Sequence, residues 1–202
     1  MSKHSEQTNR TKKRIEEAFF KIAEEKGLDA VNVRSLSLEA GISRGTFYLH
    51  YLDVYDLMDK LEEEIISGLE ALPVQQKSEQ LIYKAEEAEG QPFPSIVQFF
   101  RYIDEHHRFF KLWLHHDHSK FGNKLSQWLQ TRIDEKMPQR RPDTGAAAVP
   151  TDFMMTYFHG AFFDVIRHWL DTNRELPLEE AALVLTRLIR NGPLQTALGN
   201  RE

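Results

Sequence analysis

Residues 31–51, VNVRSLSLEAGISRGTFYLHY, form the stretch that decides the fold of this chain. Val33, Leu36 and Ala40 recur at positions i, i+3 and i+7, so they lie on one face of a short helix. Asn32 stands directly before that helix, where its side-chain oxygen can accept a hydrogen bond from a first-turn N–H. The pattern predicts a short helix that begins after Asn32 and turns one apolar face towards a core.

A glycine-containing turn separates this helix from a second short one. Gly41 follows the first helix, and glycine readily adopts the positive φ that a helix C-terminus often requires. Ser43 can cap a second helix, which we expect over residues 44–49. Two short helices joined by such a turn are typical of a helix-turn-helix, whose second helix enters the major groove of DNA.

Residues 10–60 resemble the DNA-binding domain of the tetracycline-repressor (TetR) family of bacterial transcription regulators. In that family an Ala-Gly-Val/Ile-Ser turn precedes the pattern Gly-Thr-Leu/Phe-Tyr-x-His/Tyr-Phe. The corresponding residues here are Ala40, Gly41, Ile42, Ser43, Gly45, Thr46, Phe47, Tyr48, Leu49, His50, Tyr51 and Leu52. The residues that fit the family's first helix and the turn after it are Ile15, Ala18, Phe19, Gly27 and Leu28. The departures from the pattern are Asn32 for Thr or Ser, Leu52 for Phe, and Tyr55 for a Lys that often contacts phosphate.

The resemblance implies that the second short helix and its flanks contact DNA. Arg44 has the planar fork that matches guanine O6 and N7, and Gly45 lets the backbone approach DNA closely. Thr46, Tyr48 and His50 can donate hydrogen bonds to phosphate, which position a protein without reading sequence. Without the family, the simpler interpretation of His50 is a surface histidine with no role. The residues expected to contact DNA are Lys12, Lys13, Arg34, Ser43, Arg44, Gly45, Thr46, Tyr48, His50 and Tyr51.

Charge is unevenly distributed along the chain. The 202 residues include 26 basic and 31 acidic side chains, so the net charge of −5 is not that of a protein that is basic overall. Residues 1–14 carry a local charge of +4, because they hold five basic side chains and one acidic one, Glu6. We interpret this segment as an arm that faces DNA; the alternative is a solvated, disordered tail.

The composition is ordinary for a soluble globular protein. The chain has no cysteine, which excludes disulfides and thiolate metal sites. It has no apolar run of about 18 residues, and its polar N-terminus is not a secretory signal. We therefore expect a cytoplasmic protein without a membrane-spanning helix.

Hydrophobic periodicity predicts helices and no strand, so we expect an all-α fold. A three-helix DNA-binding domain at residues 1–52 would precede a larger helical bundle at 53–190 and a frayed tail at 191–202. The other expected helices are residues 11–26, 54–73, 108–116, 121–137 and 151–173, one that Ser95 caps, and one that begins at Pro177 and ends at Asn191-Gly192-Pro193. Loops are expected at residues 73–95 and 138–150, where proline and glycine are frequent. Phe47 is expected to pack against the apolar stripe of the first helix.

The expected helix at residues 151–173 has two apolar faces, which indicates that it is covered on two sides. The TetR family dimerises through two such helices from each chain, and residues 157–189 resemble a C-terminal domain found in one branch of it. A homodimer would match a two-fold operator. The residues expected at the dimer interface are Phe158, Phe162, Val165, Trp169, Leu185 and Leu188.

Aromatic residues are dense in the C-terminal part. The family implies an effector pocket among these helices, and the alternative is a plain aromatic core. The residues expected to line the pocket are Phe99, Tyr102, Trp113, Tyr157, Phe158 and Phe162. A second cluster could suit a metal ion and consists of His106, His107, His115, His116, Asp117 and His118. No further metal motif accompanies it, so we expect neither a metal site nor a cofactor.

The sequence thus predicts a homodimeric, ligand-responsive repressor that binds a palindromic DNA operator. The alternative is a non-enzymatic interaction protein with weak DNA binding, for which Tyr55 in place of Lys is the hint. We do not expect an enzyme, because the sequence shows no pairing of a nucleophile with a base and no glycine-rich phosphate loop.

Overall fold

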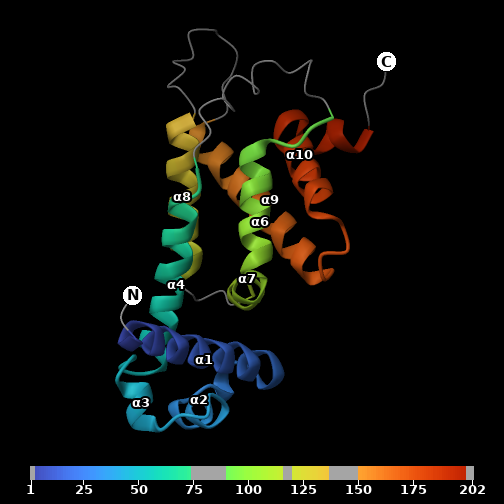
Figure 1. Cartoon of the computed structure of the whole chain (residues 1–202). Coiled ribbons are helices and arrows are strands. Elements are labelled where there is room, and N and C mark those ends of the chain that lie inside the picture. Colours follow the sequence, from blue (N-terminus) through green and yellow to red (C-terminus); the bar gives the residue numbers. More distant parts are fainter. Residues whose placement is uncertain (1–2, 74–89, 116–119, 137–149, 199–202) are drawn as a thin grey trace. The chain divides into compact units, whose positions relative to one another are not determined.

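The computed structural model describes residues 3–73, 90–115, 120–136 and 150–198 (Figure 1). Within these residues every regular element is a helix and none is a strand, so the predicted all-α fold is confirmed. The chain divides into two compact units, Met1–Ser67 and Gly68–Glu202. This division falls inside one long helix, fifteen residues beyond the boundary predicted after residue 52.

The N-terminal unit is built from α1 (Lys3–Lys26), the 3₁₀ helix η1 (Leu28–Ala30), α2 (Val33–Glu39), α3 (Arg44–Tyr48) and most of α4 (Val54–Glu70). Helix α1 begins at Lys3 rather than near residue 11, so the segment interpreted as an arm is helical. Periodicity gave no signal there because the segment has no apolar stripe. Its Lys, Glu and Gln residues nevertheless have good helix propensity, and Thr11 Oγ1 donates to Gln7 O at 3.0 Å.

Side-chain caps start three of these helices where the sequence predicts them. Asn32 accepts from Ser35 N at 3.0 Å while Ser35 Oγ accepts from Asn32 N, which is a complete capping box. Ser43 Oγ accepts from Thr46 N at 3.0 Å at the start of α3. Asp53 Oδ1 accepts from Asp56 N at 2.8 Å at the start of α4. The predicted starts of α2, α3 and α4 are therefore confirmed.

The core of the N-terminal unit joins α1 to the short helices. Phe47 has no exposed surface and lies beneath α3, as predicted. The other side chains that are almost completely buried with it are Ile15, Ala18, Phe19, Ile22, Leu36 and Leu57. Because the two short helices have few residues each, this shared core, rather than helix propensity, supplies their stability.

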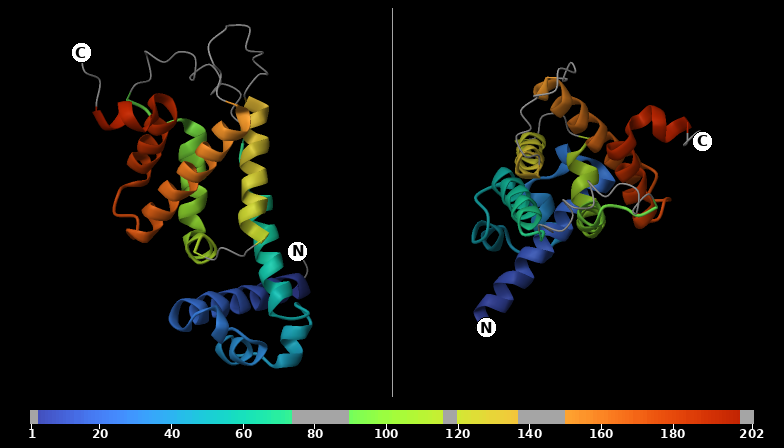
Figure 2. Two further views of the ribbon diagram at one scale, coloured as in Figure 1. Left: turned by 180° about the vertical axis from the view of Figure 1, so that it is seen from behind. Right: turned by 90° about the horizontal axis from the view of Figure 1, so that it is seen from above.

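The C-terminal unit contains α6 (Pro94–Glu105), α7 (His107–Trp113), α8 (Lys120–Lys136), α9 (Thr151–Asp171) and α10 (Leu178–Leu198). Helix α6 lies against α10, and both α7 and α8 contact α9 (Figure 2). Helix α6 begins at Pro94, so Ser95 is in its first turn and does not cap it. Proline suits the first helical position because it has no N–H to lose there.

Aromatic rings fill the core of this unit. Phe99 stacks on Trp128 with ring centroids 5.5 Å apart and meets Phe162 at 5.0 Å. Phe100 packs edge-on against Trp169 at 5.1 Å. These contacts join α6, α8 and α9, which are distant in sequence, so they could not be read from local patterns.

A strained turn follows α9. Asn173 and Arg174 both have positive φ, 51° and 61°, a backbone conformation that costs non-glycine residues energy. Trp169 Nε1 donates to Leu176 O at 2.8 Å across the turn. Arg174 Nη1 donates to Asp104 Oδ1 of α6 at 2.7 Å. These two bonds hold the turn in its conformation.

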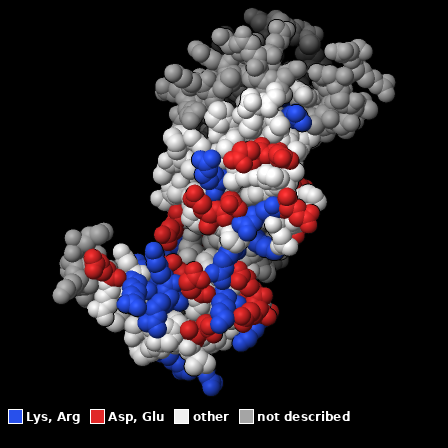
Figure 3. All heavy atoms as spheres, turned by 45° about the vertical axis from the view of Figure 1, so that its right-hand side comes forward, with Lys and Arg blue, Asp and Glu red and all other residues white. Residues whose placement is uncertain are grey.

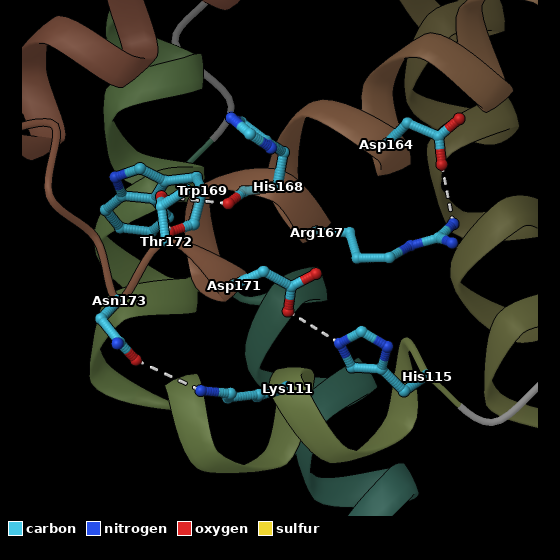
Figure 4. Close-up of polar contacts among 9 residues, drawn as sticks. All are labelled: Lys111, His115, Asp164, Arg167, His168, Trp169, Asp171, Thr172 and Asn173. Carbon is cyan, nitrogen blue, oxygen red and sulfur yellow. Dashed lines mark hydrogen bonds and ion pairs between the residues drawn. The ribbon is translucent and has the colours of Figure 1, made fainter.

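Polar contacts tie α7 to the end of α9 (Figure 4). His115 Nε2 lies 2.7 Å from Asp171 Oδ1, and Lys111 Nζ donates to Asn173 Oδ1 at 3.3 Å. His115 is therefore engaged by a carboxylate of α9. Within the described segments no group of three or more His, Cys, Asp or Glu could hold a metal ion, while His116, Asp117 and His118 lie outside them.

The end of α10 differs from the prediction. Gly192 has a φ of 73° and breaks the helix, in agreement with the expected stop at Asn191-Gly192-Pro193. Helical backbone then resumes as far as Leu198, where we expected frayed residues. The expected loops at 73–95 and 138–150 fall largely outside the described residues. No helix in the described part of the chain is long and apolar enough to cross a membrane.

Candidate nucleic-acid interface

The turn between α2 and α3 is fixed by its glycine and by an arginine from α1. Gly41 has a φ of 61°, and a Cβ placed on it would come within 2.9 Å of Arg14 Nη2. Arg14 Nη2 donates to Gly41 O at 3.1 Å. Ile42 N then donates to Ser37 O at 2.9 Å and closes the turn. Arg14, one of the basic residues of the expected arm, thus holds the turn.

Helix α3 buries one face and exposes the other. Phe47 points into the core, while Arg44, Gly45, Tyr48 and Leu49 are exposed. Leu49, directly after the helix, is 82% exposed. The outward face of α3 therefore combines a guanidinium, an open stretch of backbone, a phenol and an apolar side chain.

Two of the expected DNA contacts already have partners within the protein. Ser43 Oγ accepts the backbone N–H of Thr46, and it shares a further hydrogen bond of 2.9 Å with Thr46 Oγ1. Because a hydroxyl can donate one hydrogen bond and accept two, Ser43 Oγ retains capacity for one more bond and Thr46 Oγ1 for two. Both residues are therefore positioned by the cap before any ligand arrives.

Tyr51 is a correction to the predicted set. Only 3% of it is exposed, and it packs on Phe47 with ring centroids 5.7 Å apart. Its hydroxyl donates to Glu16 Oε1 at 3.5 Å. Burial, and then the charges of Glu16 and Glu64, raise the pKa of the Tyr51 phenol. Tyr51 belongs to the core in this conformation, which its aromatic ring and its fit to the family pattern could not reveal.

Glu16 shares this half-buried environment. Burial, and then the charge of Glu64, raise the pKa of the Glu16 carboxyl above its ordinary value, and the Tyr51 hydrogen bond only partly opposes them. A half-buried carboxylate with a second one nearby is destabilising when both are charged. The half-buried Glu16 carboxylate, with Glu64 nearby, is therefore expected to destabilise the folded N-terminal unit when it is charged.

The remaining predicted side chains lie at the surface of the unit. Arg34, Lys12 and Lys13 are exposed, and His50 is half-buried. Burial, and then the positive charge of Lys12, lower the pKa of the His50 imidazole. Lys12 of α1 is therefore close enough to His50 for their charges to interact. Figure 3 shows basic side chains gathered on one part of the molecule with acidic ones beside them.

Sequence patterns missed Lys60, which lies in α4. Its ammonium donates to Asp56 Oδ2 at 2.8 Å and to His50 O at 3.2 Å. It also lies 5.2 Å from the centroid of the Tyr51 ring. The i, i+4 spacing from Asp56 was visible in the sequence, but the approach to His50 depends on how α4 folds back on α3.

The residues expected to line a pocket occupy different environments. Phe99 and Trp113 are buried, Tyr102, Phe158 and Phe162 are half-buried, and Tyr157 is half-exposed. Phe99 and Phe162 are in contact, whereas Trp113 stacks on Phe109 with centroids 4.1 Å apart. A Cβ on Gly68 would overlap the Tyr102 ring, so α4 and α6 approach closely there.

The residues expected at a dimer interface divide into two groups. Trp169 and Leu185 are almost completely buried by their own chain, so they belong to its core. The half-buried members are Phe158, Phe162, Val165 and Leu188. Periodicity could not separate the two groups, since both lie on apolar faces. Among the residues of α9 and α10 whose side chains the structure describes, the large apolar ones that are exposed are Phe153, Tyr157, Val184 and Ile189.

Known proteins share this helical architecture. Residues 90–191 match the TetR-type family model described as the transcriptional regulator C-terminal region. No curated protein matches the chain. The TetR transcriptional regulator from Streptococcus agalactiae 2603V is similar in structure, with a TM-score of 0.61 at 18% identity over 91% of this chain and 97% of its own.

Two further solved structures share the fold. The fatty acid degradation regulator FadR from Bacillus halodurans has a TM-score of 0.60 at 15% identity, over 90% of this chain and 95% of its own. The transcriptional regulator FadR from Bacillus subtilis, solved in complex with stearoyl-CoA, has a TM-score of 0.53 at 14% identity, over 89% of this chain and 98% of its own. At these identities the likeness concerns the fold. Since the family model covers half of the chain, the chain belongs to the TetR family of transcriptional regulators.

Proposed function

We propose that this protein is a homodimeric transcriptional repressor that binds a palindromic DNA operator through its N-terminal unit. The observation that carries the proposal is the outward face of α3. That face is held by the Ser43 cap on one side and by buried Phe47 beneath, and it presents Arg44, Gly45 and Tyr48 to solvent. A short, rigid helix with an exposed arginine fits the major groove.

Each exposed side chain of α3 suits a different part of the duplex. The Arg44 guanidinium can donate two hydrogen bonds to one guanine edge. Leu49 can contact a thymine methyl, the apolar feature of the major groove. Tyr48 can donate its hydroxyl to phosphate, which positions the helix without selecting sequence. Together these contacts account for both affinity and preference.

We propose that the outward apolar surfaces of α9 and α10 form the dimer interface. Phe153 and Tyr157 are 69% and 50% exposed on α9, and Val184 and Ile189 are exposed on α10. A Cβ on Gly160, which follows them along α9, would meet no atom of its own chain, so another backbone could come close there. In the proposed interface these exposed side chains take the place of Trp169 and Leu185, which are buried within their own chain.

We propose that an apolar effector of the acyl-thioester class releases the protein from DNA. Two regulators of similar fold are named for fatty acid degradation or were solved with stearoyl-CoA. The aromatic layer of Phe99, Trp128 and Phe162 offers apolar side chains from three helices. An effector lodged among them would act by favouring one spacing of the two recognition helices.

Selection of bound fragments from sheared genomic DNA, followed by anisotropy titration with and without stearoyl-CoA, tests the proposal. We expect one enriched palindromic sequence, binding that weakens steeply with salt, and weaker binding with the acyl-CoA. Preference for no fragment over random duplex would overturn the DNA-binding proposal. Binding that the acyl-CoA leaves unchanged would overturn only the effector class. An interaction protein would show no salt-dependent binding to any duplex.

A further inference from the structure

Lys60 brings a positive charge to the C-terminal end of α3. Its ammonium is held by two acceptors, Asp56 Oδ2 at 2.8 Å and His50 O at 3.2 Å. Asp56 is itself held, because its Oδ2 also accepts from Leu52 N at 2.8 Å. The chain that leaves α3 and the second turn of α4 therefore form one hydrogen-bonded unit with Lys60 at its centre.

The ammonium of Lys60 can bind one more acceptor. An ammonium has three donors, and the two contacts above use two of them. The side chain is 47% exposed, so the third N–H has access to solvent. The ammonium also lies 5.2 Å from the centroid of the buried Tyr51 ring, a cation–π contact that further restrains it. Because these contacts already restrict the Lys60 side chain, binding of an acceptor by the third N–H should cost little further conformational entropy.

Two further residues that can donate to an anion, His50 and Lys12, are linked to this unit. His50 supplies the carbonyl that holds Lys60, and its half-buried imidazole is within electrostatic range of Lys12 of α1. Three elements, α1, the end of α3 and α4, therefore converge here. The carboxylate of Asp56 weakens the attraction of Lys60 for an anion, but Lys12 adds a second positive charge without a carboxylate in hydrogen-bond contact among the described residues.

We propose that Lys60, together with Lys12 and His50, binds a backbone phosphate of duplex DNA at the C-terminal end of α3. This inference rests on the DNA-binding function proposed above. Lys60 brings its ammonium to this end of α3 from the second turn of α4. A phosphate suits the site because its several acceptor oxygens can satisfy donors that arrive from three elements.

A structural role for Lys60 makes a different prediction. If the ammonium only stabilised the His50 carbonyl, its removal would lower the free energy of unfolding and leave the salt dependence of DNA binding unchanged. A phosphate contact instead contributes about 0.9 to the slope of log K against log salt concentration. The slope, rather than the affinity alone, therefore distinguishes the two roles.

The experiment titrates the full-length protein with a random-sequence duplex, from about 50 to 200 mM salt. Lys60→Met should reduce the magnitude of the slope by about 0.9 for each phosphate that Lys60 neutralises, whereas Lys60→Arg should retain it. Lys21→Met is the matched control, because Lys21 lies on α1 and pairs with Glu39; its slope should equal that of the wild type. Circular dichroism confirms that each variant is folded.

Each result of the salt titration either supports the phosphate site or overturns it. A wild-type slope in Lys60→Met overturns the phosphate site while the DNA-binding proposal stands. No salt-dependent binding by the wild type overturns both. If Lys60→Met does not fold, Asp56→Asn replaces it, since an amide oxygen can still accept from Leu52 N. That variant should bind the random duplex at least twice as tightly if Lys60 reaches phosphate; unchanged affinity overturns the inference.

Discussion

The two units of this chain owe their structures to different kinds of interaction. In the N-terminal unit, side-chain caps only three residues from their partners define where the short helices begin, as with Asn32, Ser43 and Asp53. In the C-terminal unit, contacts between aromatic rings from different helices define the core, as with Phe99, Trp128 and Phe162.

The difference explains why the two units were predictable to different degrees. The starts of α2, α3 and α4, the glycine turn and the exposed face of α3 follow from neighbours in sequence, so one sequence suffices to predict them. The sequence predicts that Tyr51 contacts DNA, whereas its ring is buried, because its environment depends on α1. Trp169 and Leu185 were assigned to a dimer interface because periodicity shows that a face is apolar but not what covers it.

The largest expected effect would test whether the two units fold separately. Phe47→Ala removes the ring at the centre of the N-terminal core and should cost about 3–5 kcal/mol of unfolding free energy. Hydrogen exchange should then accelerate in peptides of α1–α3 and remain slow in those of α6–α10. The control Leu49→Ala, on an exposed neighbour, should change neither. Equal acceleration in both units would show that they unfold together.

The next effect separates recognition from folding within the N-terminal unit. Arg44→Ala should lose about 1–3 kcal/mol of discrimination between the selected operator and its single-base variants. Its unfolding midpoint should stay that of the wild type, because Arg44 is exposed. Tyr48→Phe should weaken binding equally on all sequences. Competition titrations measure both effects. Retained base preference in Arg44→Ala would remove this residue from sequence reading.

A third variant tests whether the turn between α2 and α3 requires a glycine at position 41. Gly41→Ala places a side chain at a φ of 61° and a Cβ 2.9 Å from Arg14 Nη2, which should cost about 1–2 kcal/mol of stability. Gly45→Ala is the matched control: its φ is not positive, and the nearest atom to its Cβ, Ser43 Oγ, lies 3.6 Å away. Urea unfolding should show a loss of stability for the first variant and none for the second. Equal stabilities would mean that the turn tolerates any residue.

The smallest expected effect concerns a feature that only tertiary structure created. Burial and Glu64 raise the pKa of Glu16 above its ordinary value near 4.5, so the native state binds this proton more tightly than the unfolded state. Stability therefore falls as pH rises through the interval between the two pKa values, and the loss is complete above it. Glu16→Gln should then be more stable than the wild type at pH 7, by less than about 1 kcal/mol because the group is partly exposed.

Thermal unfolding at several pH values measures this effect. The advantage of Glu16→Gln should disappear below pH 4.5, where the wild-type carboxyl is protonated in both states. Glu25→Gln, on the exposed side of the same helix, should show no such dependence. If Glu16→Gln were less stable than the wild type at pH 7, the hydrogen bond from Tyr51 would outweigh the burial of the charge.

The sequence by itself determined the helical class, the glycine turn and the caps. It also determined which side chains of α3 are exposed and which are buried. Each of these depends on atoms within about one helical turn, whose spacing the backbone dictates. Only the tertiary structure decided that Arg14 holds the turn, that Tyr51 is buried and that Lys60 reaches His50. These contacts join segments that meet only after folding, so their partners depend on how the helices pack and not on local sequence.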